Sequence, residues 1–105
     1  MTVIIHSNFS KLHTKEILCK VEEILKSRNV DILYDDDTEE SIKKCDFIIT
    51  IGGDGTIIHH SKYAAFYNKP ILGINAGRVG FLTELEKEKI TATTTEVLKA
   101  VKIMD

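Results

Sequence analysis

Cysteine is scarce in this sequence, with only Cys19 and Cys45 among 105 residues. They form no Cys-x-x-Cys pair and have no histidine at the spacing typical of a zinc ligand. This argues against a zinc site and against a disulfide framework. We expect both thiols to be reduced and buried, as free cysteines in proteins usually are.

Long apolar runs are absent as well. Near the N-terminus only residues 3–5 are apolar in succession, no basic leader precedes them, and no later stretch has the length of a membrane span. We therefore expect a cytoplasmic protein without a membrane partner. On that expectation Asn8-Phe9-Ser10, formally a glycosylation acceptor, occurs by chance.

Neither sign of charge is in large excess. Fourteen basic and sixteen acidic residues give a formal net charge of −2, which argues against nucleic acid as a partner. The chain is long enough for one modest core and too short for two, with 43% of its residues hydrophobic. We predict a single domain over residues 1–105.

Apolar segments rich in β-branched residues alternate with segments of helical periodicity. Strands are predicted at residues 2–5, 30–34, 47–51 and 71–74. Helices are predicted at residues 12–26, around 42–44, at 57–68 and from about 95 to 104. Residues 47–51 are apolar on both faces, which is typical of a central parallel strand. The alternation predicts an α/β layered sandwich with a mostly parallel, Rossmann-like sheet flanked by helices.

Carboxylates crowd residues 35–40. A metal site is one interpretation, but their spacing does not match a calcium-binding loop. We favour a solvated loop that opens a short helix, because acidic side chains are favourable at a helix N-terminus. No metal ligand is predicted in the chain.

Polar or glycine-bearing segments follow three of the predicted strands: His6-Ser7-Asn8, residues 52–56 and residues 75–83. The carboxyl ends of parallel strands meet at one edge of the sheet, where ligands of such folds bind. The sequence therefore predicts a binding edge.

The segment at residues 52–56 has three glycines around Asp54. It matches neither the P-loop nor the Gly-x-Gly-x-x-Gly fingerprint. Glycine permits positive φ and close approach of the backbone to a ligand, so the segment suits a phosphate. Asp54 in such a place can accept the proton of an attacking alcohol or hold magnesium. A plain turn is the alternative interpretation.

Two motifs together resemble NAD kinase, the family that phosphorylates the adenosine-ribose 2′-hydroxyl of NAD to make NADP. They are GGDGT at residues 52–56 and GINAGRVGFLT at residues 73–83. Diacylglycerol kinase, sphingosine kinase and 6-phosphofructokinase relatives carry loops similar to the first motif, whereas the second is much more specific.

The resemblance implies a role for each matching residue. Asp54 would accept the proton of the 2′-hydroxyl. The loop facing the ATP phosphates would consist of Gly52, Gly53, Gly55 and Thr56. The wall near the NAD adenosine, and the loop leading to it, would consist of Gly80, Phe81, Leu82, Asn75, Gly77 and Arg78. Ala76, Arg78 and Val79 are departures, since leucine, histidine and leucine are frequent there in relatives.

The resemblance also implies ATP as donor, NAD as substrate, magnesium as cofactor and a second, mostly β domain. This sequence stops at Asp105 and has no Asn-Glu or Asn-Asp pair. We therefore expect an N-terminal domain with an incomplete site, inactive alone and part of a homo-oligomer as full-length protein. The alternatives are a lipid or sugar kinase that shares the GGDGT loop, and a non-catalytic nucleotide-binding or regulatory fragment.

Overall fold

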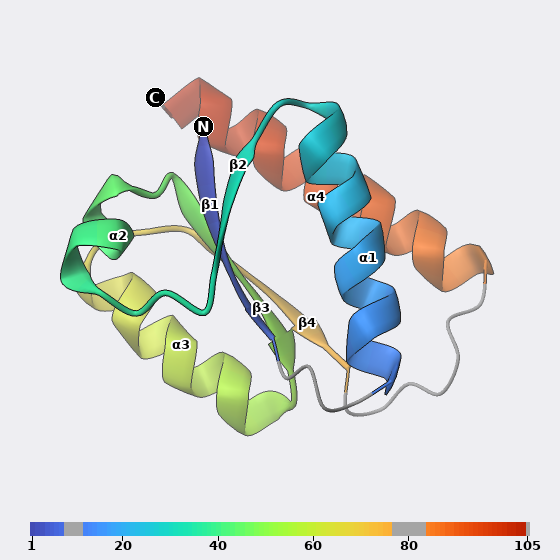
Figure 1. Cartoon of the computed structure of the whole chain (residues 1–105), viewed down its shortest axis with the longest axis horizontal. Coiled ribbons are helices and arrows are strands. Elements are labelled where there is room, and N and C mark those ends of the chain that lie inside the picture. The colour runs from blue at the N-terminus through green and yellow to red at the C-terminus, as the bar shows by residue number, and fades with distance from the viewer. Residues whose placement is uncertain (8–11, 77–83, 105) are drawn as a thin grey trace.

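The computed structural model describes residues 1–7, 12–76 and 84–104 (Figure 1). The strands are β1 (Thr2–Ser7), β2 (Asp31–Tyr34), β3 (Phe47–Gly52) and β4 (Ile71–Asn75). The helices are α1 (Leu12–Ser27), α2 (Glu39–Lys44), α3 (Asp54–Phe66) and α4 (Glu84–Met104). None of the described helices is long and apolar enough to cross a membrane.

The four strands form one sheet in the order β2-β1-β3-β4, and every neighbouring pair is parallel. Helices α1 and α4 cover one face of the sheet, and α2 and α3 cover the other (Figure 1). The predicted α/β class, with its parallel sheet flanked by helices, is confirmed.

Strand β3 lies at the centre of the sheet, and all six of its residues are buried. Its side chains alternate between the faces: Phe47, Ile49 and Ile51 join the cluster under α1 and α4, and Ile48 joins the cluster under α2 and α3. A run that is apolar on both faces is what a doubly covered parallel strand requires.

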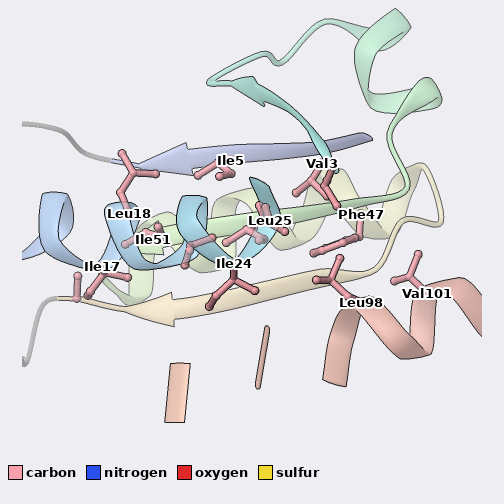
Figure 2. Packing of buried hydrophobic residues seen from close by; sticks show 14 residues of the cluster. Val3, Ile5, Ile17, Leu18, Ile24, Leu25, Phe47, Ile51, Leu98 and Val101 are labelled. Carbon is pink, nitrogen blue, oxygen red and sulfur yellow. The ribbon is translucent and has the colours of Figure 1, made fainter. Parts of the chain in front are cut away.

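The main core lies between the sheet and the pair α1 and α4. Figure 2 shows labelled side chains of β1, β3, α1 and α4 gathered in this one cluster. The apolar stripe of α1 supplies Ile17, Leu18, Val21, Ile24 and Leu25. The opposite face has a smaller core, consisting of Ile4, Ile42, Cys45, Ile48 and Ala64.

The sequence-based start of the last helix, about residue 95, is wrong, because α4 begins at Glu84. Glutamate and lysine at its start are good helix formers, whereas the threonines after them disfavour helix in isolation. Packing overrides that preference: Thr94 is buried, and Leu98 and Val101 join the main core. The Thr91 hydroxyl donates to the Lys87 carbonyl at 3.0 Å, within the helix.

The expectation that both thiols are buried is also wrong in part. Cys45 is buried and Cys19 is exposed, and both are free. Cys19 follows Leu18 on α1 but lies outside the buried stripe, so its position on the helix decides its exposure.

Close packing of β4 against α3 generates a prediction about Gly73. A Cβ atom there would lie 2.8 Å from Ile57 Cγ2, so the Ile57 side chain, or the helix that carries it, would have to shift. We expect Gly73→Ala to lower the free energy of unfolding by about 1–3 kcal/mol, measured by urea denaturation. The matched control is Gly55→Ala, because a Cβ atom at Gly55 meets nothing within 4 Å and alanine favours the helix. Equal stability of the two variants would contradict this account.

Candidate functional site

The order of the strands defines where a ligand should bind. Strands β1 and β3 are neighbours, and the chain leaves β1 for α1 on one face and β3 for α3 on the other. In parallel sheets ligands bind outside the carboxyl ends of the two strands at such a switch point. Here those ends carry Ser7 and Gly52.

Asp54 lies at this edge as the first residue of α3, and its side chain is exposed. Asn75, the last residue of β4, donates from Nδ2 to Asp54 Oδ1 at 2.5 Å. The β3–β4 register pairs Gly52 with Asn75, and the Ala76 amide donates to the Gly52 carbonyl at 2.9 Å. The register therefore brings together two predicted site residues that lie far apart in the sequence.

The N-terminus of α3 suits an anion. Its N-cap is Gly53, which supplies no side-chain hydrogen bond to the first turn, and the helix runs for 13 residues. Backbone N–H groups and the helix dipole at such an end favour a phosphate.

The glycines of the first motif matter because they have no side chain, and their backbone angles are ordinary. None of the four glycines in the described residues has a positive φ, which corrects one of the two reasons given for them from the sequence. Cβ atoms at Gly53 and Gly55 would meet nothing within 4 Å, so these positions leave room beside the helix N-terminus. At Gly52 a Cβ atom would lie 3.2 Å from Thr56 Cβ, so that glycine permits close packing of strand and helix.

A cluster of histidines and carboxylates lies at the same edge, on the face covered by α3. The buried His6 ring stacks on His60 of α3, with ring centroids 4.0 Å apart and an interplanar angle of 11°. His6 Nε2 lies 3.3 Å from Asp37 Oδ1, and His6 Nδ1 lies 3.7 Å from Asp35 Oδ1. Burial, followed by the interaction with His6, lowers the pKa of His60, which favours its neutral form.

The acidic loop before α2 has two roles. Asp36 Oδ1 accepts from the backbone N–H and hydroxyl of Thr38, and Oδ2 accepts from the Ser41 hydroxyl. These hydrogen bonds, the one from Ser41 first, lower the pKa of Asp36. The predicted helix-opening role is thus confirmed for Asp36, whereas Asp35 and Asp37 flank His6 instead.

No metal ligand was predicted from the sequence, and this cluster was not identified from it. The available signal was that His6 and Asp35 lie at the carboxyl ends of two strands, β1 and β2, that a parallel sheet places side by side. Thr56 is described and exposed in the first turn of α3, and His59 is exposed on the same helix. Five predicted site residues lie outside the described residues: Gly77, Arg78, Gly80, Phe81 and Leu82.

A family model described as the ATP-NAD kinase N-terminal domain matches residues 1–102. The chain belongs to this family. The family match confirms the resemblance inferred from the two glycine motifs, and it favours NAD kinase over the lipid and sugar kinases that share the first motif.

Similar proteins agree with the NAD kinase family. The NAD kinase of Caldicellulosiruptor saccharolyticus is 46% identical over 85 residues, covering 80% of this chain and 32% of the relative. The NAD kinase of Caldicellulosiruptor bescii is 36% identical over 99 residues, covering 94% of this chain and 38% of the relative. The chain therefore spans about a third of the length of these curated relatives.

Two solved structures share the fold. An NAD kinase from Archaeoglobus fulgidus in complex with ATP has a TM-score of 0.56 and 32% identity, covering 100% of this chain and 39% of that chain. An archaeal flavodoxin has a TM-score of 0.64 at 12% identity, covering 97% of this chain and 99% of that chain, which shows the fold alone.

The hydrogen bonds of Asp36 generate a prediction about pH. Because the pKa of Asp36 is lowered in the folded state, its stabilising effect is present at neutral pH and is lost as the pH falls through that pKa. We expect Ser41→Ala to raise the pKa of Asp36, so that this loss begins at higher pH. NMR titration of the Asp36 carboxyl carbon measures it. Ser61→Ala is the control, because the Ser61 hydroxyl donates to Ile57 O within α3; an unchanged Asp36 pKa in Ser41→Ala would contradict the assignment.

Proposed function

We propose that the whole protein transfers the γ-phosphoryl group of ATP to the adenosine-ribose 2′-hydroxyl of NAD, making NADP. The observation that supports this most directly is the exposed Asp54 carboxylate at the N-terminus of α3, hydrogen-bonded by Asn75. It lies in a chain whose residues 1–102 match the NAD kinase N-terminal domain.

The phosphates of ATP bind, in this proposal, at the start of α3. The open space beside Gly53 and Gly55 admits them close to the backbone, and the N–H groups of the first turn donate to their oxygens. Gly52 and Thr56 complete the phosphate loop. Arg78, Gly77, Gly80, Phe81 and Leu82 form the NAD side of the site as the resemblance implies.

Asp54 acts as the general base. Its carboxylate accepts the proton of the NAD 2′-hydroxyl while that oxygen forms a bond to the γ-phosphorus. The bond between the γ-phosphorus and the bridging oxygen breaks, and its electron pair leaves on the β-phosphate of ADP. The hydrogen bond from Asn75 at 2.5 Å fixes the orientation of the carboxylate, which positions the base before substrate arrives.

Magnesium fits this arrangement. The Asp54 carboxylate and the Asn75 side-chain oxygen are hard oxygen donors, the ligand type that Mg²⁺ prefers beside phosphates. When bound, the ion would neutralise charge on the transferred phosphoryl group.

Residues outside this chain would supply the second wall of the site, in keeping with the third of the relatives' length that the chain spans. The reaction would take place in the cytoplasm, a compartment compatible with the exposed free thiol of Cys19. The remaining alternative, a non-catalytic nucleotide-binding domain, would bind ATP or NAD without turning them over.

Removing the base tests the mechanism. We expect Asp54→Asn in the whole protein to reduce kcat for NADP formation by about 10²–10⁴-fold, because asparagine keeps the shape but cannot accept the proton. Enzymatic detection of NADP with ATP, Mg²⁺ and NAD measures it, and circular dichroism checks the fold. Asp31→Asn is the matched control, since Asp31 is exposed at the start of β2, on the opposite edge of the sheet. Near-normal turnover in Asp54→Asn would remove Asp54 from the mechanism.

Filling the space beside the helix tests the phosphate loop. We expect Gly55→Ala to raise the KM for ATP by roughly tenfold without loss of folding stability, because its methyl group enters only the space assigned to phosphate. Steady-state kinetics at saturating NAD measures the KM, and urea denaturation measures the stability. An unchanged KM would place the phosphates elsewhere.

A further inference from the structure

The histidine cluster at the carboxyl edge has no part in the reaction proposed above. It combines residues from three elements: His6 of β1, Asp37 of the loop between β2 and α2, and His60 of α3. One ligand atom from each of these three side chains lies within 4.8 Å of the other two. Chain segments that are distant in the sequence thus converge on one small volume.

The cluster is costly to form without a ligand. His6 has only 5% of its side chain exposed, and two imidazole rings in contact cannot both carry a charge without repulsion. His60 Nδ1 is buried and has no hydrogen-bond partner among the described residues. A buried nitrogen without a partner is destabilising, so a ligand bound to His60 Nδ1 would remove that cost.

The charges select a cation rather than an anion. Asp35 and Asp37 both face His6, so a phosphate at this place would meet two carboxylates. Two imidazole nitrogens and one carboxylate oxygen are a mixed donor set, which suits zinc, cobalt or nickel. Magnesium and calcium prefer sites made of oxygen alone.

We propose that His6, Asp37 and His60 bind one divalent transition-metal ion of the zinc type. Metal–ligand bonds of about 2.1 Å place neighbouring tetrahedral ligands roughly 3.4 Å apart. His6 Nε2 and Asp37 Oδ1 already lie 3.3 Å apart. One ligand atom of His60 lies within 4.8 Å of both, and the His60 ring must turn out of its stacked arrangement on His6 to direct a nitrogen lone pair at the ion.

Asp35 is a positioning residue in this site. Its carboxylate lies on the Nδ1 side of His6, at 3.7 Å, which favours the tautomer that carries the proton there. The Nε2 lone pair then faces the metal, the arrangement found for most histidine ligands. The metal ties β1, the loop before α2 and α3 together on the face of the sheet that has the smaller core.

Zinc binding by the whole protein tests the proposal directly. After treatment with a chelator, calorimetric titration with zinc chloride in the absence of nucleotide should show one saturable site per chain. Cobalt should give visible absorption bands typical of tetrahedral coordination. At a hundredfold excess of zinc over Kd, the Tm should rise by more than about 5 °C, because the metal binds only the folded state.

Variants identify the ligands. We expect His60→Gln and Asp37→Asn each to weaken zinc binding by at least about tenfold, the lower end of losses seen on removing parts of a metal site. The control is His59→Gln, which removes a neighbouring exposed histidine of the same helix and should bind zinc as the wild type does. Asp54→Asn should also leave zinc affinity unchanged, so the metal site and the proposed kinase mechanism can fail separately.

Three results would overturn the proposal. They are the absence of saturable zinc binding by the wild-type protein, equal zinc affinity in His60→Gln and wild type, and displacement of zinc by millimolar magnesium. The first would leave the cluster as ion pairs between the buried His6 and two exposed carboxylates. The second would indicate adventitious binding elsewhere, and the third would indicate a site of oxygen ligands.

Discussion

The parallel pairing of β3 between β1 and β4 is the constraint on which the rest of the structure depends. It buries all six residues of β3, and it aligns Ser7 with Ile51 and Gly52 with Asn75. A slip of one residue would turn Phe47, Ile49 and Ile51 to the opposite face. It would also move Asn75 away from Asp54, so the packing of the core and the geometry of the site are held by the same register.

The two faces of the sheet are unequal, and the proposed metal site lies on the face with the smaller core. The face under α1 and α4 has an extended apolar core, whereas the face under α2 and α3 has a smaller one. On this second face His6 follows Ile4 in the strand alternation, where another apolar residue would be expected. Burying a polar ring there is unfavourable unless it has a partner. The carboxylates, His60 and the proposed metal provide partners for it.

Much of the fold could be predicted because its signals are local. Periodicity located the four strands and most of the helices, and the apolar run at residues 47–51 identified the central strand. The start of α4 could not be predicted, because the buried Thr94 and the packing of Leu98 and Val101 override the weak helix preference of its threonines. The prediction that Cys19 is buried was wrong because it rested on residue type alone. Burial on α1 depends on which side of the helix faces the sheet, and Cys19 lies on another side.

The sequence by itself determined the class of the fold and the resemblance to NAD kinase, and it gave the expectation of a phosphate loop around Asp54, because each depends on residues close together in the chain. Only the tertiary structure decided that Asn75 donates a hydrogen bond to Asp54 and that the side chains of His6, Asp37 and His60 lie close together. Those contacts join segments far apart in the chain. They depend on the strand order, the register and the face that each helix covers, and nearest-neighbour preferences do not specify these.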